Sequence, residues 1–229
     1  MRAIHPRVLI AALAVFTVAG GVAHSQNRSP EVLNTMEVRE LIASAEPGAH
    51  ARLSTHFAAL AERNTADARR HTAMSQSFGG NPSRNLATGM SAHCKRLAEL
   101  STQSATTLRE LAAHHKTLAA GAPSTAPKDS TRFEGGAGAP QPNERELSAL
   151  AAKAGTPADH RGLEEYFVTL ARRHAADADA HVTMAQAYRG TRIAQAAAHC
   201  DRLVTLSREA AKEATAAAAM HKQLAGVGR

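Results

Sequence analysis

The stretch from residue 50 to residue 78, HARLSTHFAALAERNTADARRHTAMSQSF, decides the fold of this protein. Apolar side chains recur in it at intervals of three and four, as at Leu53, Phe57, Leu60 and Met74, and this spacing places them on one face of an α-helix. The stretch holds no glycine or proline and many alanines, which favour a continuous helix. A helix of this length with an apolar stripe buries that stripe against a partner helix.

The same pattern occurs again 110 residues later, in residues 160–188. A second helical stripe, in residues 90–118, is repeated in residues 196–224 at an offset of 106. The offset changes at one place only, where the first copy carries Gly-Gly-Asn-Pro at residues 79–82. A length difference confined to glycine and proline marks a loop. The sequence therefore predicts two copies of one unit, in which a short loop joins two long helices.

Each copy is also predicted to begin with a shorter helix. In the first copy, Ser29 and Pro30 are typical of a helix start, and Glu-Pro-Gly at residues 46–48 ends the segment. In the second copy, residues 143–153 form the corresponding segment. We therefore predict an all-α protein of two tandem antiparallel long-helix hairpins, each preceded by a short helix, which pack together as a four-helix bundle.

Two further segments differ in character from the repeats. Residues 1–25 carry Arg2 and Arg7 near an apolar run that ends in small residues, the pattern of a secretory signal peptide cleaved after residue 25 or after Ala23. Residues 121–143 are rich in proline and glycine and are typical of a flexible linker. The predicted order is signal peptide 1–25, hairpin repeat 29–120, linker 121–143 and hairpin repeat 144–226. We expect the mature protein to be periplasmic or secreted.

The composition argues against several classes of function. The formal net charge is +7, but Lys and Arg are interleaved with Asp and Glu, and the chain has no Trp, two Tyr and five Phe. Aromatic platforms for stacking bases are therefore missing, and nucleic acid is not an expected partner. No stretch after the signal segment is long and apolar enough to serve as a transmembrane anchor. Because HExxH, GxSxG, a phosphate loop and CxxCH are all absent, we expect no enzymatic activity.

Histidines are the residues that most suggest a function. Eleven of the 13 histidines lie beyond residue 25, and eight of these form equivalent positions in the two copies. These eight form the pairs His50/His160, His71/His181, His93/His199 and His115/His221. In an antiparallel hairpin, residues equally far from the loop lie at the same height. We therefore expect His71 opposite His93 near the loop, His50 opposite His115 near the open end, and the same arrangement in the second copy.

The level near the loop carries the richest set of metal-ligating side chains. Asp67 lies four residues before His71, on the same helix face. A carboxylate with imidazoles suits zinc, nearby methionines shift the preference to copper, and two facing imidazoles also suit a haem, which we favour less. The predicted metal ligands are Asp67, His71, His93, Asp177, His181 and His199. Weaker candidates are His50, His115, His160, His221, His174, Met74, Met90 and Met184.

Two other interpretations of these histidines stay open. A core-facing histidine is often only a hydrogen-bonded polar residue, in which case the protein is a structural or interaction protein of the bacterial envelope. Imidazoles titrate at about pH 6.5, so protons taken up in the core would loosen the bundle. The sequence thus predicts a non-catalytic bundle that binds copper, zinc or haem, with structural polar layers as the alternative.

Cys94 and Cys200 occupy equivalent positions on the apolar stripes. In an exported protein an even number of cysteines suggests a disulfide, and this one would tie the two hairpins together. If the two cysteines stay reduced, they add thiolates to the possible metal ligands. The sequence leaves both alternatives open.

Overall fold

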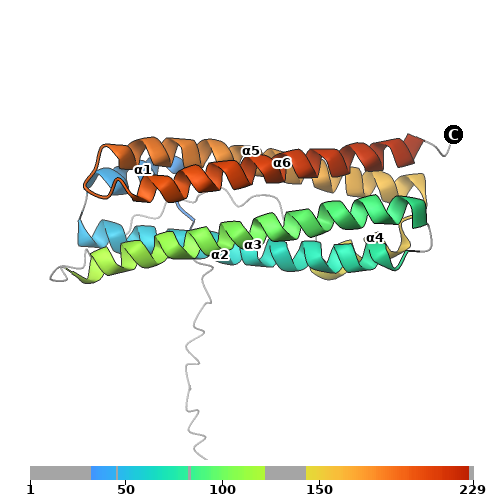
Figure 1. Cartoon of the computed structure of the whole chain (residues 1–229), viewed down its shortest axis with the longest axis horizontal. Coiled ribbons are helices and arrows are strands. Elements are labelled where there is room, and N and C mark those ends of the chain that lie inside the picture. The colour runs from blue at the N-terminus through green and yellow to red at the C-terminus, as the bar shows by residue number, and fades with distance from the viewer. Residues whose placement is uncertain (1–31, 45, 82–83, 122–142, 227–229) are drawn as a thin grey trace, which may run out of the picture.

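The structure is a computed structural model, and it describes residues 32–44, 46–81, 84–121 and 143–226. The predicted signal peptide and nearly all of the predicted linker lie outside the described residues. The described chain contains six helices (Figure 1): α1 (Thr35–Ser44), α2 (Pro47–Gly79), α3 (Arg84–Ala120), α4 (Glu144–Lys153), α5 (Pro157–Arg189) and α6 (Ala196–Gly226). The predicted fold class is confirmed, since each long hairpin follows a short helix and the two units pack together.

Helix α1 begins later than the sequence suggested. Asn34 Oδ1 accepts a hydrogen bond of 3.0 Å from the backbone N–H of Glu37, and the Glu37 carboxylate accepts one of 2.8 Å from the backbone N–H of Asn34. This capping box satisfies two N–H groups that a helix start leaves free, and it fixes the start at Thr35. Ser29, the predicted start, lies outside the described residues, and the described residues 32–34 before α1 are not helical. The second copy uses the same device at Asn143, the N-cap of α4.

The two hairpins, α2 with α3 and α5 with α6, meet along α3 and α6 (Figure 1). They run in opposite directions, so that the loop end of each hairpin lies beside the open end of the other. One core cluster contains Phe78 from the loop end of the first hairpin and Leu163 from the open end of the second. The other core cluster contains Phe57 and Tyr188 in the reverse arrangement. The core therefore consists of two clusters, one toward each end of the bundle.

The short helices fill the space between α2 and α5. In the described part of the chain these two long helices make no close backbone contact with each other, whereas α1 and α4 each pack against both of them. Val38 and Ile42 of α1 are buried in one core cluster, and Leu147 and Ala151 of α4 are buried in the other. The middle of the α2–α5 face is consequently left to side chains.

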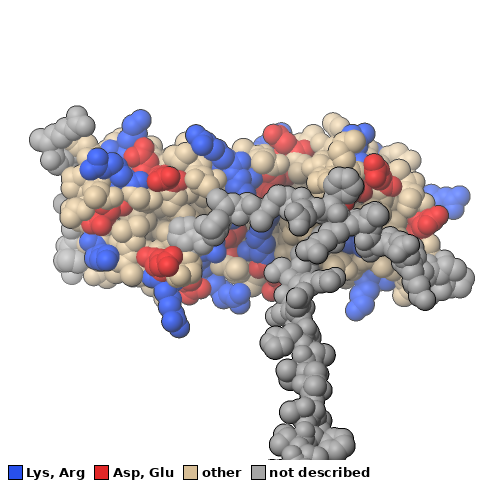
Figure 2. Space-filling view, turned by 180° about the vertical axis from the view of Figure 1, so that it is seen from behind, with Lys and Arg blue, Asp and Glu red and all other residues tan. Residues whose placement is uncertain are grey.

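The surface fits the charge pattern of the sequence. On the face opposite to that of Figure 1, Lys and Arg are interspersed with Asp and Glu and do not form one large patch of a single sign (Figure 2). None of the described helices is both long and apolar enough to span a bilayer.

Candidate functional site

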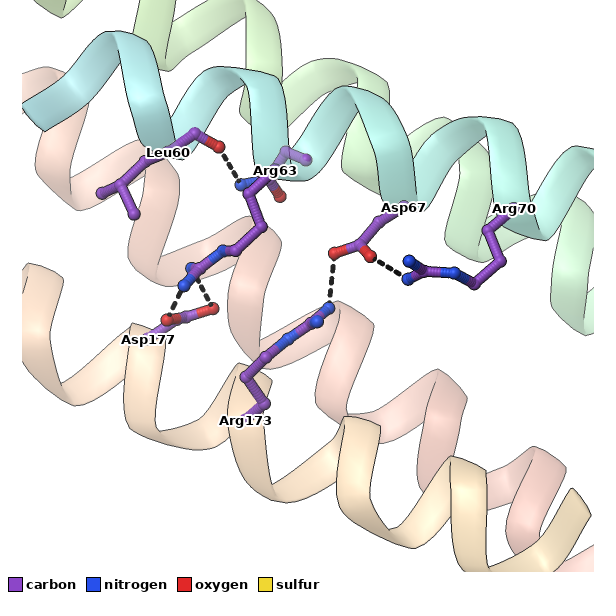
Figure 3. Close-up of polar contacts among 7 residues, drawn as sticks. Leu60, Arg63, Asp67, Arg70, Arg173 and Asp177 are labelled. Carbon is purple, nitrogen blue, oxygen red and sulfur yellow. Dashed lines mark hydrogen bonds and ion pairs between the residues drawn. The ribbon is translucent and has the colours of Figure 1, made fainter. Parts of the chain in front are cut away.

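The middle of the α2–α5 face is spanned by two symmetric ion pairs (Figure 3). Arg63 donates two hydrogen bonds of 2.9 Å to the carboxylate of Asp177, and Arg173 donates one of 2.5 Å to Asp67. Arg63 is equivalent to Arg173, and Asp67 to Asp177, so an approximate twofold axis relates the two contacts. Asp67 also accepts a hydrogen bond of 2.5 Å from Arg70 on its own helix. The two carboxylates predicted to bind a metal are thus engaged by guanidinium groups.

The predicted ligands His71 and His181 lie in the core. The ring of His71 is fully buried and stacks on Phe167 of the other hairpin, with centroids 6.5 Å apart and planes 19° apart. Neither ring nitrogen of His71 has a hydrogen-bond partner. Burial, reinforced by His174 and two arginines, lowers the pKa of His71 to about 3. Burial also lowers the pKa of His181 to about 4. Both rings are therefore neutral at neutral pH.

His93 and its equivalent His199 lie at the α3–α6 seam, the line along which the two hairpins meet. His93 Nδ1 is 2.5 Å from Glu213 Oε1, and His93 Nε2 is 3.1 Å from Met220 Sδ. His199 Nδ1 is 3.6 Å from Glu110 Oε2. The seam histidines therefore face partners on the other hairpin and not the core histidines of α2 and α5. The structure does not assemble the predicted metal ligands into one site.

The weaker candidates at the open ends are the histidines that the structure brings together. The Nδ1 atoms of His50 and His115 are 3.1 Å apart, and so are those of His160 and His221. All four side chains are buried, as the register of each hairpin predicts for residues that face a partner helix. Burial lowers the pKa of all four, that of His115 to about 3 and that of His221 to about 4. We call these contacts the histidine pairs.

The histidine pairs do not fit a haem, and the described residues hold no larger ligand cluster. An iron held axially between two nitrogens needs them about 4 Å apart, at about 2 Å per bond, and the pairs are closer. Among the described residues no group of three or more His, Cys, Asp or Glu is arranged to hold a metal ion. The candidate methionines divide between the two core clusters, Met74 and Met90 in one and Met184 in the other.

The two histidine pairs differ in one hydrogen bond. His115 Nε2 lies 2.7 Å from the Tyr188 hydroxyl. The equivalent residue in the other half is Phe78, whose ring packs on His221 with centroids 5.8 Å apart, and His221 Nε2 has no partner. A buried N–H without an acceptor is costly. The tautomer that avoids it has the proton of His221 on Nδ1, where it is donated to His160 Nδ1.

This difference predicts opposite changes in stability for two substitutions. Phe78→Tyr should stabilise the protein by about 1 kcal/mol, because the new hydroxyl can donate to His221 Nε2. Tyr188→Phe should destabilise it by about 1–2 kcal/mol, because it removes the matching bond at His115. Urea unfolding at neutral pH measures both changes. A loss of stability in Phe78→Tyr would show that the hydroxyl is not accommodated against His221.

Two further histidines belong to the buried set. His56, which has no histidine at the equivalent position of the second copy, accepts a hydrogen bond of 3.0 Å at Nδ1 from the backbone N–H of Leu33, and burial lowers its pKa to about 4. His174, a weaker candidate, is also buried, and burial lowers its pKa to about 4. The sequence holds one signal for the burial of His56. The equivalent residue of the second copy is Tyr166, so both copies carry a ring at this position.

Both cysteines are free and fully buried. The disulfide considered from the sequence is not formed, because Cys94 lies in one core cluster and Cys200 in the other. The opposed directions of the hairpins place these equivalent residues toward opposite ends of the bundle. Burial raises the pKa of both thiols to about 12, so both are protonated at neutral pH.

Comparison of the chain with known protein families, with curated proteins and with solved structures found no match. The fold and the side chains described above define the class of protein. It is an all-helical bundle of two tandem hairpins with buried, paired histidines in its core.

Proposed function

We propose that this protein is an exported, non-catalytic helical bundle that responds to acid, closed at neutral pH and opened by protons taken up in its core. The observation that carries this proposal is the presence of a buried histidine pair in each half of the bundle, with the same Nδ1–Nδ1 separation of 3.1 Å. Such pairs stabilise the closed state only while at least one ring of each is neutral.

The chemistry of a pair explains the response. In a neutral pair one Nδ1–H donates to the lone pair of the other Nδ1. Full protonation places two N–H groups and two positive charges face to face in a buried position, which breaks the hydrogen bond and favours solvent exposure.

The groups around the pairs do little to stabilise an added charge. His114, a further imidazole, faces the pair of His50 and His115, and the Tyr188 hydroxyl contacts His115. The charge of a protonated His93 would act against protonation of His221, and the exposed carboxylate of Asp159 acts in favour of protonation of His160. A single exposed carboxylate does not compensate the burial of two imidazolium rings.

Export would connect this response to a biological signal. The segment 1–25 has the pattern of a signal peptide, and a protein outside the cytoplasm meets the pH of its surroundings directly. Opening would expose the leucine and alanine side chains of the core, which would offer apolar surface to envelope partners. In the rival interpretation the histidines are only polar layers and the bundle does not open reversibly.

The buried cysteines provide the test. Cys94 and Cys200 are each 0% exposed and belong to different core clusters, so each reports on opening toward one end of the bundle. Dithiodipyridine, which reacts with thiols in mild acid, should find both protected at about pH 7.5 and both reactive at about pH 5. Protection should return when an unlabelled sample is neutralised. Continued protection at about pH 4, or protection that does not return, would contradict the proposal.

A second candidate function, the binding of a transition metal, has support from one contact outside the histidine pairs. His93 Nε2 lies 3.1 Å from Met220 Sδ at the α3–α6 seam.

A further inference from the structure

The α3–α6 seam holds a histidine ring between a carboxylate and a thioether. His93 Nδ1 lies 2.5 Å from Glu213 Oε1, and His93 Nε2 lies 3.1 Å from Met220 Sδ. His93 belongs to α3 and the other two residues belong to α6, so the site exists only when the two hairpins pack together. The histidine pairs and the central ion pairs do not use these three side chains.

The contact between Nε2 and Sδ calls for a cation. A neutral His93 that donates its Nδ1–H to Glu213 carries no hydrogen on Nε2. The nitrogen and sulfur lone pairs then face each other across 3.1 Å. That approach is favourable when a positive charge, either a proton on Nε2 or a metal ion, is shared by the two atoms.

We propose that His93 and Met220 bind a copper(I) ion at the α3–α6 seam, with Glu213 orienting the imidazole. An imidazole nitrogen together with a thioether sulfur is a soft ligand set of the kind that selects copper(I), whereas zinc is held by thiolate, imidazole and carboxylate. A metal-ligating histidine usually donates its other ring N–H to a carboxylate or carbonyl, which fixes the tautomer and the ring orientation. Glu213 is placed to accept that hydrogen bond.

The separation of Nε2 and Sδ is short enough for one ion to bind both atoms. Two atoms 3.1 Å apart fit an ion with a bond of about 2.0 Å to nitrogen and about 2.3 Å to sulfur, at an angle of about 90°. This angle leaves further coordination positions open to solvent or to an exogenous ligand. The side chain of His93 is 22% exposed and that of Glu213 is 26% exposed, so an ion can enter from solvent.

A glycine leaves room for the thioether beside the imidazole. A Cβ atom at Gly89 would lie 2.7 Å from the terminal methyl carbon of Met220 and 3.5 Å from its sulfur. The absence of a side chain at Gly89, one turn before His93 on α3, therefore lets Met220 lie against the α3 backbone beside the imidazole.

The second copy provides an internal control. Its seam has His199 Nδ1 at 3.6 Å from Glu110 Oε2, and the residue equivalent to Met220 is His114. This half of the seam lacks the thioether, so within the described chain the soft pair of ligands occurs in one half only. We therefore expect one copper(I) ion per chain.

Anaerobic titration of the full chain with copper(I), in competition with the coloured chelator bathocuproine, tests this proposal. One equivalent should bind, and Met220→Leu should weaken binding about tenfold or more, because leucine keeps the shape and removes the sulfur. His114→Leu, the matched change in the other half, should leave the affinity unchanged. X-ray absorption should find one sulfur neighbour at about 2.3 Å in the parent protein and none in Met220→Leu.

Circular dichroism at about pH 7.5 checks that each variant keeps its helices, and at this pH the result is independent of opening by acid. The proposal is overturned if the folded parent binds no copper(I). It is also overturned if Met220→Leu binds copper(I) as tightly as the parent, or if His114→Leu weakens binding as much as Met220→Leu does.

Discussion

Acidification from about pH 7 to about pH 5 should unfold the bundle in one steep, cooperative transition. Six buried histidines have a pKa of about 3 or 4 in the folded state, chiefly because burial disfavours the charged ring, against an ordinary value of 6.5. These six are His56, His71, His115, His174, His181 and His221. Between the two values the unfolded chain binds more protons than the folded chain. Stability is therefore complete above pH 6.5 and falls as the pH falls toward 4.

The size of the effect follows from the number of rings. Each depressed histidine contributes a slope of about 1.4 kcal/mol per pH unit in this window, so six contribute up to about 8 kcal/mol per unit. A domain whose free energy of unfolding is about 5–15 kcal/mol loses all of it within about two pH units at this slope. The midpoint should therefore lie at about pH 5, above the range of about pH 4 in which carboxylates titrate.

Circular dichroism followed against pH measures this transition, and a double variant identifies its cause. His71→Leu with His181→Leu removes two titrating rings, one from each copy, and His71 makes no hydrogen bond that could be lost. The midpoint should fall and the number of protons taken up should drop by about two. His199→Gln, at a partly exposed seam position, should leave the midpoint unchanged. A parent midpoint below about pH 4, or a double variant with the parent midpoint, would attribute acid unfolding to other groups.

Asp67→Ala should destabilise the protein by about 3 kcal/mol or more, far beyond the cost of the equivalent Asp177→Ala. The Asp67 side chain is 3% exposed, and it neutralises Arg70 and Arg173, which are 15% and 18% exposed. Removing this carboxylate breaks two largely buried ion pairs at once, and breaking a buried ion pair from one side is costly. In the matching ion pair Asp177 is 25% exposed and Arg63 36% exposed, so solvent replaces much of that interaction, and we expect a loss of about 1 kcal/mol.

Urea unfolding at neutral pH compares the two variants directly, since urea does not screen charge. Asp67→Asn, which keeps the shape and removes the charge, should resemble Asp67→Ala. Equal losses for Asp67→Ala and Asp177→Ala would show that burial does not distinguish the two ion pairs. A small loss for Asp67→Asn would assign the effect to packing.

Much of the fold was predictable because it depends on local spacing. The stripe in residues 50–78 and its repeat fix which side chains face a partner helix, and the glycine-containing loop fixes the height of each residue within its hairpin. That register places His50 beside His115, and the structure shows their Nδ1 atoms 3.1 Å apart. The start of α1 at Thr35 was not predicted, because the sequence carries two possible start signals. Pro30 is one, and the capping box of Asn34 and Glu37 is the one at which α1 begins.

The composition of the candidate sites was less predictable, because each depends on contacts between the two copies. Asp67 had the spacing of a metal ligand next to His71, yet its carboxylate is engaged by Arg173, 106 residues away in the chain. His93 had the height of a partner for His71, yet it faces Glu213 and Met220 on α6. A helix exposes several faces at any height, and the neighbouring hairpin determines which residues meet each face.

The sequence by itself determined the helices, the loops, the duplication and the histidine pairs, because each depends on spacing within one hairpin. Only the tertiary structure decided that the hairpins run in opposite directions and that α1 and α4 separate α2 from α5. This arrangement of the hairpins places Cys94 and Cys200 in different core clusters and brings His93 next to Met220 at the seam. The physical reason is that the orientation of two duplicated hairpins depends on many weak contacts between residues about 100 positions apart. A local sequence pattern does not reveal the total energy of these contacts.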